Sequence, residues 1–163
     1  MKAIVNGTIL TPQGEVKGTL LFDERIQAIT TAPNVQADEV IDAKGMYVAP
    51  GLVDLHIHGY LGEDASDGSE EGIRIMAKGL LKNGVTSFLP TTMTVSWPEI
   101  EAALDNIRKL KPESQQASFD GSEILGCHAE GPFINPERKG AQAADNFLAP
   151  DADKVIPHND IIK

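Results

Sequence analysis

The sequence predicts an α/β protein in which a small β unit, residues 1–50, precedes a longer unit of alternating strands and helices, residues 51–163. Short strand patterns separated by turn residues fill the first fifty positions. The chain-breaking pair Pro50-Gly51 then follows a strand end and marks the boundary. From residue 52 onward strand and helix patterns alternate, which is typical of parallel βαβ units.

The first unit is expected to be a set of short strands joined by tight turns. Its predicted strands are 3–5, 8–10, 19–22, 26–30, 39–42 and 46–48. Asn6-Gly7 has the composition of a two-residue hairpin turn, and residues 23–25 form a second turn signal. Fifty residues are few for an independent hydrophobic core.

The second unit is expected to contain three strands, at 52–57, 85–89 and 123–128. The first helix has apolar residues at helical spacing and ends at Asn83-Gly84; these residues are Ile73, Met76, Ala77, Leu80 and Leu81. The second helix begins at Ser96, which has Glu99 three residues later as in a capping box. Its apolar stripe is Ile100, Ala103, Leu104 and Ile107.

The remaining segments are expected to be irregular. A polar linker is predicted at 112–120, and residues 130–163 are loop-like, with a helix beginning near 151–155. Since one βαβ unit takes roughly 30 residues, the second unit holds about three strands with their helices. A closed eight-stranded barrel needs about 250 residues, so the length excludes a complete barrel.

Composition narrows the function classes. The chain has 14 Lys+Arg and 24 Asp+Glu, a net charge of −10, which argues against nucleic acid or an anionic membrane surface as a partner. No apolar run approaches the ~20 residues that span a bilayer. The first residues lack the features of a signal peptide, and a single cysteine, Cys127, excludes an internal disulfide. We therefore expect a cytoplasmic protein.

The first candidate site lies at the end of strand 52–57. Because strand side chains alternate between faces, Asp54, His56 and His58 share one face. Neutral imidazoles are good ligands for a divalent metal ion. Asp54 is in position to accept a ring N–H from a ligating histidine and to orient it. A solvated strand face that happens to carry these residues is the alternative.

The second candidate site lies at the end of strand 123–128. The same alternation places His128 and Glu130 on one face and Cys127 on the other, where a small buried hydrophobic role is expected. Carboxyl ends of parallel strands meet at one edge of a sheet, so Glu130 is expected to reach a metal held by His56 and His58. The alternative for Glu130 is a loop carboxylate that caps the next turn.

Together the two motifs resemble a known family. The segment Asp54-Leu55-His56-Ile57-His58 resembles the D-x-H-x-H signature of the amidohydrolase superfamily. The segments 86–92, 128–133 and 139–142 resemble those of N-acetylglucosamine-6-phosphate deacetylases, and the likeness covers essentially the whole chain. It implies the N-terminal part of a (β/α)8 metal-dependent hydrolase barrel, about three βα units, preceded by part of a small β-sandwich domain.

The resemblance also implies an activity and roles for residues. The activity is removal of the acetyl group from N-acetylglucosamine 6-phosphate, giving glucosamine 6-phosphate and acetate, with zinc or iron as cofactor. Glu130 would be the primary metal ligand, and His56 and His58 would complete a second metal position. Ala141 and Gln142 would lie against the sugar, Ala141 through its backbone and Gln142 through its side-chain amide.

The resemblance further implies that the catalytic aspartate and two more histidine ligands come from later barrel strands, beyond residue 163. We therefore expect the chain alone to be inactive or nearly so, and the complete enzyme to be a homodimer. Two alternatives stay open. One is a non-catalytic metal-binding or assembly module. The other is a dihydroorotase- or hydantoinase-like amidohydrolase, which generally uses a bridging lysine where this sequence has Glu130.

Overall fold

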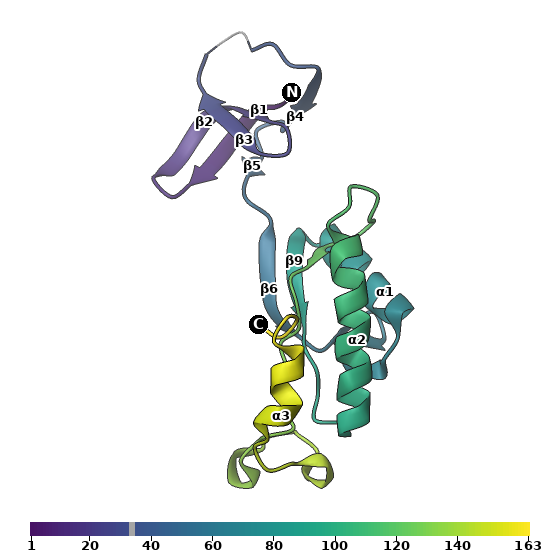
Figure 1. The fold of residues 1–163 in the computed structure, drawn as a ribbon. Coiled ribbons are helices and arrows are strands. Elements are labelled where there is room, and N and C mark those ends of the chain that lie inside the picture. The colour runs from purple at the N-terminus through teal and green to yellow at the C-terminus, as the bar shows by residue number, and fades with distance from the viewer. Residues whose placement is uncertain (33–34) are drawn as a thin grey trace. The chain divides into compact units, whose positions relative to one another are not determined.

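The computed structural model describes residues 1–32 and 35–163, and it divides into two compact units, Met1–Pro50 and Gly51–Lys163. Each unit has its own main sheet (Figure 1). The first is built of strands alone, whereas the second combines parallel strands with helices. The chain is therefore a mixed α/β protein.

The first unit is a five-stranded mixed sheet. Its strands are β1 (Lys2–Thr11), β2 (Gly14–Phe22), β3 (Ile26–Thr30), β4 (Glu39–Asp42) and β5 (Tyr47–Val48). They lie in the order β3-β2-β1-β4, and β5 pairs with the later part of β1. The β1–β2 and β2–β3 pairs are antiparallel, while β4 and β5 run parallel to β1. The predicted turn at 23–25 and the predicted strand at 39–42 are confirmed.

The predicted hairpin at Asn6-Gly7 is wrong, because β1 runs straight through it. Asn6 has a φ of 56°, and the β1–β2 register shifts at this point, so the pair forms a bulge inside one strand. A Cβ on Gly7 would lie 2.7 Å from Cγ2 of Val48, so a bare glycine is what lets β5 approach. The hairpin turn lies instead at residues 12–13.

In the second unit three parallel strands form the central sheet. They are β6 (Leu52–Ile57), β9 (Val85–Pro90) and β10 (Glu123–Ile124), in the order β10-β9-β6. A two-stranded hairpin follows β6, made of β7 (Gly59–Tyr60) and β8 (Glu63–Asp64). The helices are α1 (Glu70–Lys82), α2 (Trp97–Ser114) and the short α3 (Ala152–Val155). None of the helices among the described residues has the length and apolar character that a membrane crossing needs.

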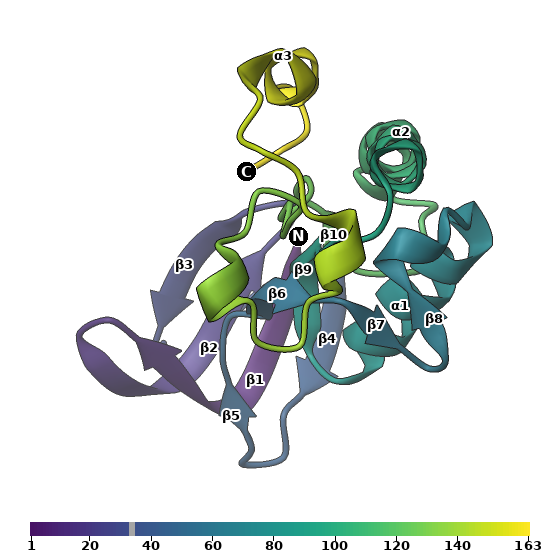
Figure 2. The ribbon, with the colours of Figure 1, turned by 90° about the horizontal axis from the view of Figure 1, so that it is seen from below.

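Helices α1 and α2 lie on the same side of β9, and the core of this unit fills the space between them (Figures 1 and 2). Phe88 of β9 is fully buried there. The apolar stripes predicted for the two helices are buried as well, apart from the partly exposed Leu81; the buried members are Ile73, Met76, Ala77, Leu80, Ile100, Ala103, Leu104 and Ile107. The core thus fixes the middle strand from one side.

Helix α2 is longer than predicted. Its predicted start is confirmed, since the Ser96 backbone N–H donates to Glu99 Oε2 at 2.9 Å. Its end lies at Ser114, beyond Pro112, where the sequence indicated a polar linker. The Ser114 hydroxyl accepts the Ile124 backbone N–H at 2.9 Å, which ties the last turn of α2 to β10.

The third strand is shorter than predicted. β10 ends at Ile124, and the rest of the expected strand makes single parallel bridges, His128 with Thr91 and Cys127 with Ile162. The chain near residue 162 therefore runs parallel to the segment after β10. These bridges still carry the strand direction as far as Glu130, which positions the candidate site.

Candidate metal centre

Three side chains meet where the strands of the second unit end. Oε2 of Glu130 lies 3.0 Å from Nε2 of His56 and 3.2 Å from Nε2 of His58. The two Nε2 atoms are 3.2 Å apart. Ligands about 2.0–2.2 Å from a tetrahedral ion are about 3.3 Å from one another, close to these separations. Within the described part of the chain, these three residues form the cluster of His, Cys, Asp or Glu side chains that could hold a metal ion.

The carboxylate oxygen itself indicates a cation. Glu130 Oε2 is buried and has no hydrogen-bond partner among the described residues. A buried carboxylate oxygen without a partner is costly, and two imidazole nitrogens face it. A divalent ion would satisfy all three atoms, so the residues present fit a metal. The His56 side chain is 48% exposed, which leaves one side of the centre open to water or substrate.

The orientation of His58 leaves its inward nitrogen free to bind. Nδ1 of His58 lies 3.2 Å from the backbone carbonyl of Thr91. Only an N–H makes a hydrogen bond to a carbonyl, so in the neutral ring the proton resides on Nδ1 and Nε2 keeps its lone pair. A backbone carbonyl behind a histidine is a usual arrangement for a metal ligand.

Two adjacent buried threonines after β9 hold the ligand-bearing segments. The Thr91 hydroxyl accepts the Ile57 backbone N–H at 3.0 Å, and the Thr91 N–H donates to the Ile57 carbonyl at 2.9 Å. The Thr92 hydroxyl accepts the Glu130 backbone N–H at 3.1 Å. Thr91 therefore fixes the backbone between the two histidines, and Thr92 fixes the backbone of the glutamate.

Sequence reasoning assigned no role to these threonines, although the family resemblance included their segment. The available signal was a pair of hydroxyl residues directly after a buried strand, at the edge where the ligands gather. Both side chains are fully buried, and buried hydroxyl groups need partners.

Asp54 and His128 contact different parts of His56: Asp54 its backbone and His128 its ring. Asp54 Oδ1 accepts the backbone N–H of His56 at 3.0 Å, instead of the ring N–H that the sequence suggested. The ring of His128 lies beside the ring of His56, with the centroids 4.6 Å apart and the planes tilted by 54°. Asp54 thus shapes the strand backbone, and His128 packs directly against a candidate ligand.

Gln142 contacts the centre from the loop that follows. Its side chain is buried, with Nε2 donating to Glu130 Oε1 at 2.5 Å and Oε1 accepting the Thr94 backbone N–H at 2.9 Å. The amide therefore engages protein atoms at both ends, which differs from the expectation that it faces a sugar. The preceding residue, Ala141, is exposed. Lys139 donates to the Gln142 carbonyl at 3.3 Å.

Cys127 takes no part in the centre. The side chain is fully buried in the core, on the face opposite His128, as the alternation predicted. Burial raises the pKa of the Cys127 thiol to about 12. The residue is therefore a protonated, unreactive thiol at neutral pH, and the expected hydrophobic role is confirmed.

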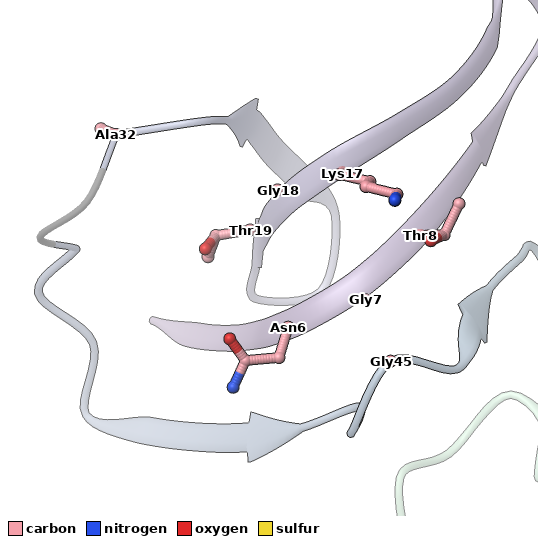
Figure 3. A pocket seen from close by; sticks show the side chains of 8 residues that line it. All are labelled: Asn6, Gly7, Thr8, Lys17, Gly18, Thr19, Ala32 and Gly45. Carbon is pink, nitrogen blue, oxygen red and sulfur yellow. The ribbon is translucent and has the colours of Figure 1, made fainter.

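The first unit has a pocket of another kind. It opens beside the bulge of β1 and is lined by polar and small residues, among them Asn6, Thr8, Lys17 and Thr19 (Figure 3). Lys17 is the basic side chain that Figure 3 shows there. The lining residues contain no cluster of ligating groups comparable to the centre in the second unit.

The chain is similar to known hydrolases. Residues 47–159 match the family model described as the amidohydrolase family. An N-acetylglucosamine-6-phosphate deacetylase from Lysinibacillus sphaericus is 34% identical over 155 residues, covering 93% of this chain and 39% of the relative. One from Bacillus subtilis (strain 168) is 46% identical over 93 residues, 57% of this chain and 23% of the relative.

A solved structure shows the same likeness. The crystal structure of N-acetylglucosamine-6-phosphate deacetylase from Pasteurella multocida superposes with a TM-score of 0.87 at 28% identity. The match covers 99% of this chain and 43% of that one. The chain thus spans well under half the length of the relatives that it resembles.

Proposed function

The chain belongs to the amidohydrolase family, and we propose that its centre of His56, His58 and Glu130 serves metal-dependent hydrolysis of the acetyl group of N-acetylglucosamine 6-phosphate. The observation that carries this proposal is the convergence of two Nε2 atoms and one carboxylate oxygen within 3.0–3.2 Å. The names of the similar proteins support the substrate. Zinc and iron both suit imidazole and carboxylate ligands.

In this mechanism the residues of the chain hold the metal ion and orient its ligands. Bound there, a divalent cation supplies Lewis acidity, which activates water and polarises the amide carbonyl. Glu130 and the two imidazoles fix the position of the reacting centre, and Thr91 and Thr92 hold their backbones. The exposed side of His56 gives water and substrate access.

The loop of residues 139–142 is the proposed sugar-binding segment. Gln142 touches Glu130, so this loop borders the carboxylate at which the acetyl group would react. Ala141 is exposed beside it and presents its backbone, as the family resemblance implies. Exposed Lys139 in this loop and exposed Arg138 directly before it are the cations nearest to a phosphate bound here, on an otherwise acidic chain.

We propose that the second unit corresponds to about three βα units of a (β/α)8 barrel and the first unit to part of a β-sandwich. The parallel order of β6, β9 and β10 supports this, with the centre at their carboxyl ends, where barrel enzymes place catalytic residues. The parallel bridge between Cys127 and Ile162 occurs where a further strand would begin.

We also propose that the 163-residue chain alone hydrolyses the substrate at most in traces. Amide hydrolysis needs a base that takes a proton from water and passes it to the leaving amine. The metal-ligand group among the described residues contains Glu130 as its carboxylate, and that side chain accepts a hydrogen bond from Gln142 through Oε1 and points Oε2 at the proposed metal position. Deacetylation by the purified chain at a rate comparable with the longer relatives would contradict this.

Metal binding tests the proposed centre. Zn²⁺ affinity is measured by competition with a chromogenic chelator for the wild type and for His56→Gln and Glu130→Gln. We expect each substitution to weaken binding at least about tenfold, because each removes a ligand. His158→Gln and Glu137→Gln are the matched controls, since His158 contacts Arg108 and Glu137 is exposed.

The outcomes separate the readings. Equal affinity in all five proteins would contradict the proposed centre. Hydantoinase-like enzymes generally use a bridging lysine where this chain has Glu130, so weaker binding by Glu130→Gln favours a centre that depends on this carboxylate.

A further inference from the structure

The amide of Gln142 is held in one orientation by the chemistry of its neighbours. The backbone nitrogen of Thr94 can only donate, and it lies 2.9 Å from Gln142 Oε1. The Glu130 carboxylate can only accept, and its Oε1 lies 2.5 Å from Gln142 Nε2. The amide oxygen must therefore face Thr94 and the amide nitrogen must face Glu130.

The same contact determines where the other carboxylate oxygen points. Glu130 is fixed at its backbone, where the N–H donates to the Thr92 hydroxyl, and at its far end, where Gln142 holds Oε1. A glutamate has three rotatable side-chain bonds, and two anchors leave little freedom between them. With Oε1 held, Oε2 is directed between the two imidazoles.

Burial strengthens this arrangement. Gln142 is only 6% exposed, so its hydrogen bonds do not compete freely with water. A hydrogen bond to an ionised carboxylate is also stronger than one between neutral groups. Because Gln142 is the last residue of the 139–142 loop, this contact joins that loop to the centre.

We propose that Gln142 is a positioning residue that aims Glu130 Oε2 at the metal. The position of the 139–142 loop and the affinity for the metal are then coupled. This inference rests on the proposed metal centre of His56, His58 and Glu130. It assigns the side-chain amide of Gln142 to the glutamate, and leaves contact with a sugar to the exposed backbone of Ala141.

The test measures Co²⁺ binding to the full chain by visible absorption, which reports both affinity and coordination geometry. In Gln142→Leu both hydrogen bonds are lost, and we expect affinity to fall about 10- to 100-fold with an altered spectrum. Gln142→Asn stays polar but is one methylene too short to span Thr94 and Glu130, so we expect a similar loss. Gln116→Leu, at an exposed glutamine after α2, is the control and should leave both readouts unchanged.

The outcomes distinguish this inference from the proposal beneath it. If the wild type binds no Co²⁺, the metal centre fails and the inference fails with it. If the wild type binds and Gln142→Leu binds within twofold with the same spectrum, only the positioning role is overturned. A purely structural role would lower the thermal midpoint of the metal-free chain and leave the spectrum of its Co²⁺ complex intact.

A measurement on the wild type covers the case in which the variants do not fold. The side-chain NH₂ of Gln142 is followed by ¹⁵N NMR during titration with Zn²⁺. We expect a clear shift, because the metal would withdraw charge from the carboxylate to which this group donates. An unchanged Gln142 resonance in a chain that has bound Zn²⁺ would overturn the inference.

Discussion

Thr92 connects two chain segments that lie 38 residues apart. Its hydroxyl accepts the Glu130 backbone N–H at 3.1 Å, and its own backbone N–H donates to the His128 carbonyl at 3.1 Å. The side chain is fully buried, so water cannot replace either bond. Thr92 therefore fixes the backbone position from which the Glu130 side chain projects.

Thr92→Val should destabilise the chain and weaken metal binding. Valine has the same shape but no oxygen, so the buried Glu130 N–H loses its acceptor, at a cost of about 1–3 kcal/mol in the free energy of unfolding. Denaturant titration gives that free energy, and chelator competition gives the Zn²⁺ affinity. Thr86→Val, at an exposed position of β9, is the control. Equal losses in both variants would show that the Thr92 hydroxyl has no special role.

At this scale the sequence predicted which side chains share a face, and it missed what holds them. Alternation along a strand is local, so the common face of His56 and His58 follows directly from their spacing. Asp54 and Gln142 both accept hydrogen bonds from backbone N–H groups. The donor to Asp54 is His56, and the donor to Gln142 is Thr94, 48 residues distant. No pattern of residue types specifies such pairs.

Helices α1 and α2 are joined by a paired ion contact at the surface of the second unit. Arg74 on α1 donates to both oxygens of Glu113 on α2, at 2.5 and 2.6 Å. The hydrogen bonds from Arg74 lower the pKa of the Glu113 carboxyl below its usual range. Bidentate geometry makes this contact more specific than a single exposed ion pair.

Acid should weaken this connection. A carboxyl whose pKa is lower in the folded state stabilises the fold at pH values above its unfolded pKa. For glutamate the unfolded pKa is about 4.3. That contribution is lost as the pH falls through the lowered folded pKa. We expect Glu113→Gln to be less stable than the wild type at neutral pH, with the difference shrinking as the pH falls toward about 3. Urea titrations across this pH range measure it.

The exposed Glu137→Gln serves as the comparison for that series. A constant difference between wild type and Glu113→Gln at every pH would mean that the ion pair does not contribute through the charge of Glu113. A difference that grows on acidification would have the opposite sign to the one derived from the lowered pKa, and it would contradict the argument directly.

Element boundaries followed the sequence where local signals were unambiguous. β6 begins after Pro50-Gly51 and ends within the His-x-His motif, as predicted. The errors came from tertiary contacts that override local preference. Asn6-Gly7 favours a turn in isolation, but strand pairing on both sides converts it to a bulge. Pro112 favours a helix end, but contacts of Glu113 and Ser114 carry α2 one more turn.

At the scale of the whole molecule, β6 is the least covered strand of the second unit. It is at one edge of the sheet β10-β9-β6, and among the described strands it pairs with β9. Val53 and Leu55, which share the face opposite His56, are 54% and 60% exposed, and Leu52 at the start of the strand is 62% exposed. The residues on its other face meet Glu130, so the apolar side faces away from the centre. An exposed apolar edge strand is a typical site of association.

The chain should therefore self-associate through β6, and Leu55→Lys should oppose it. Burying one leucine contributes about 1.5–3 kcal/mol, so its replacement by a charge should weaken the association constant at least about tenfold. Sedimentation velocity over a wide concentration range measures this, with Ile156→Lys as the control because Ile156 is 60% exposed in a short helix outside the sheet. Wild-type chains that stay monomeric at every concentration would show that this edge is protected. Equal weakening by both lysines would point to general charge repulsion instead of pairing at β6.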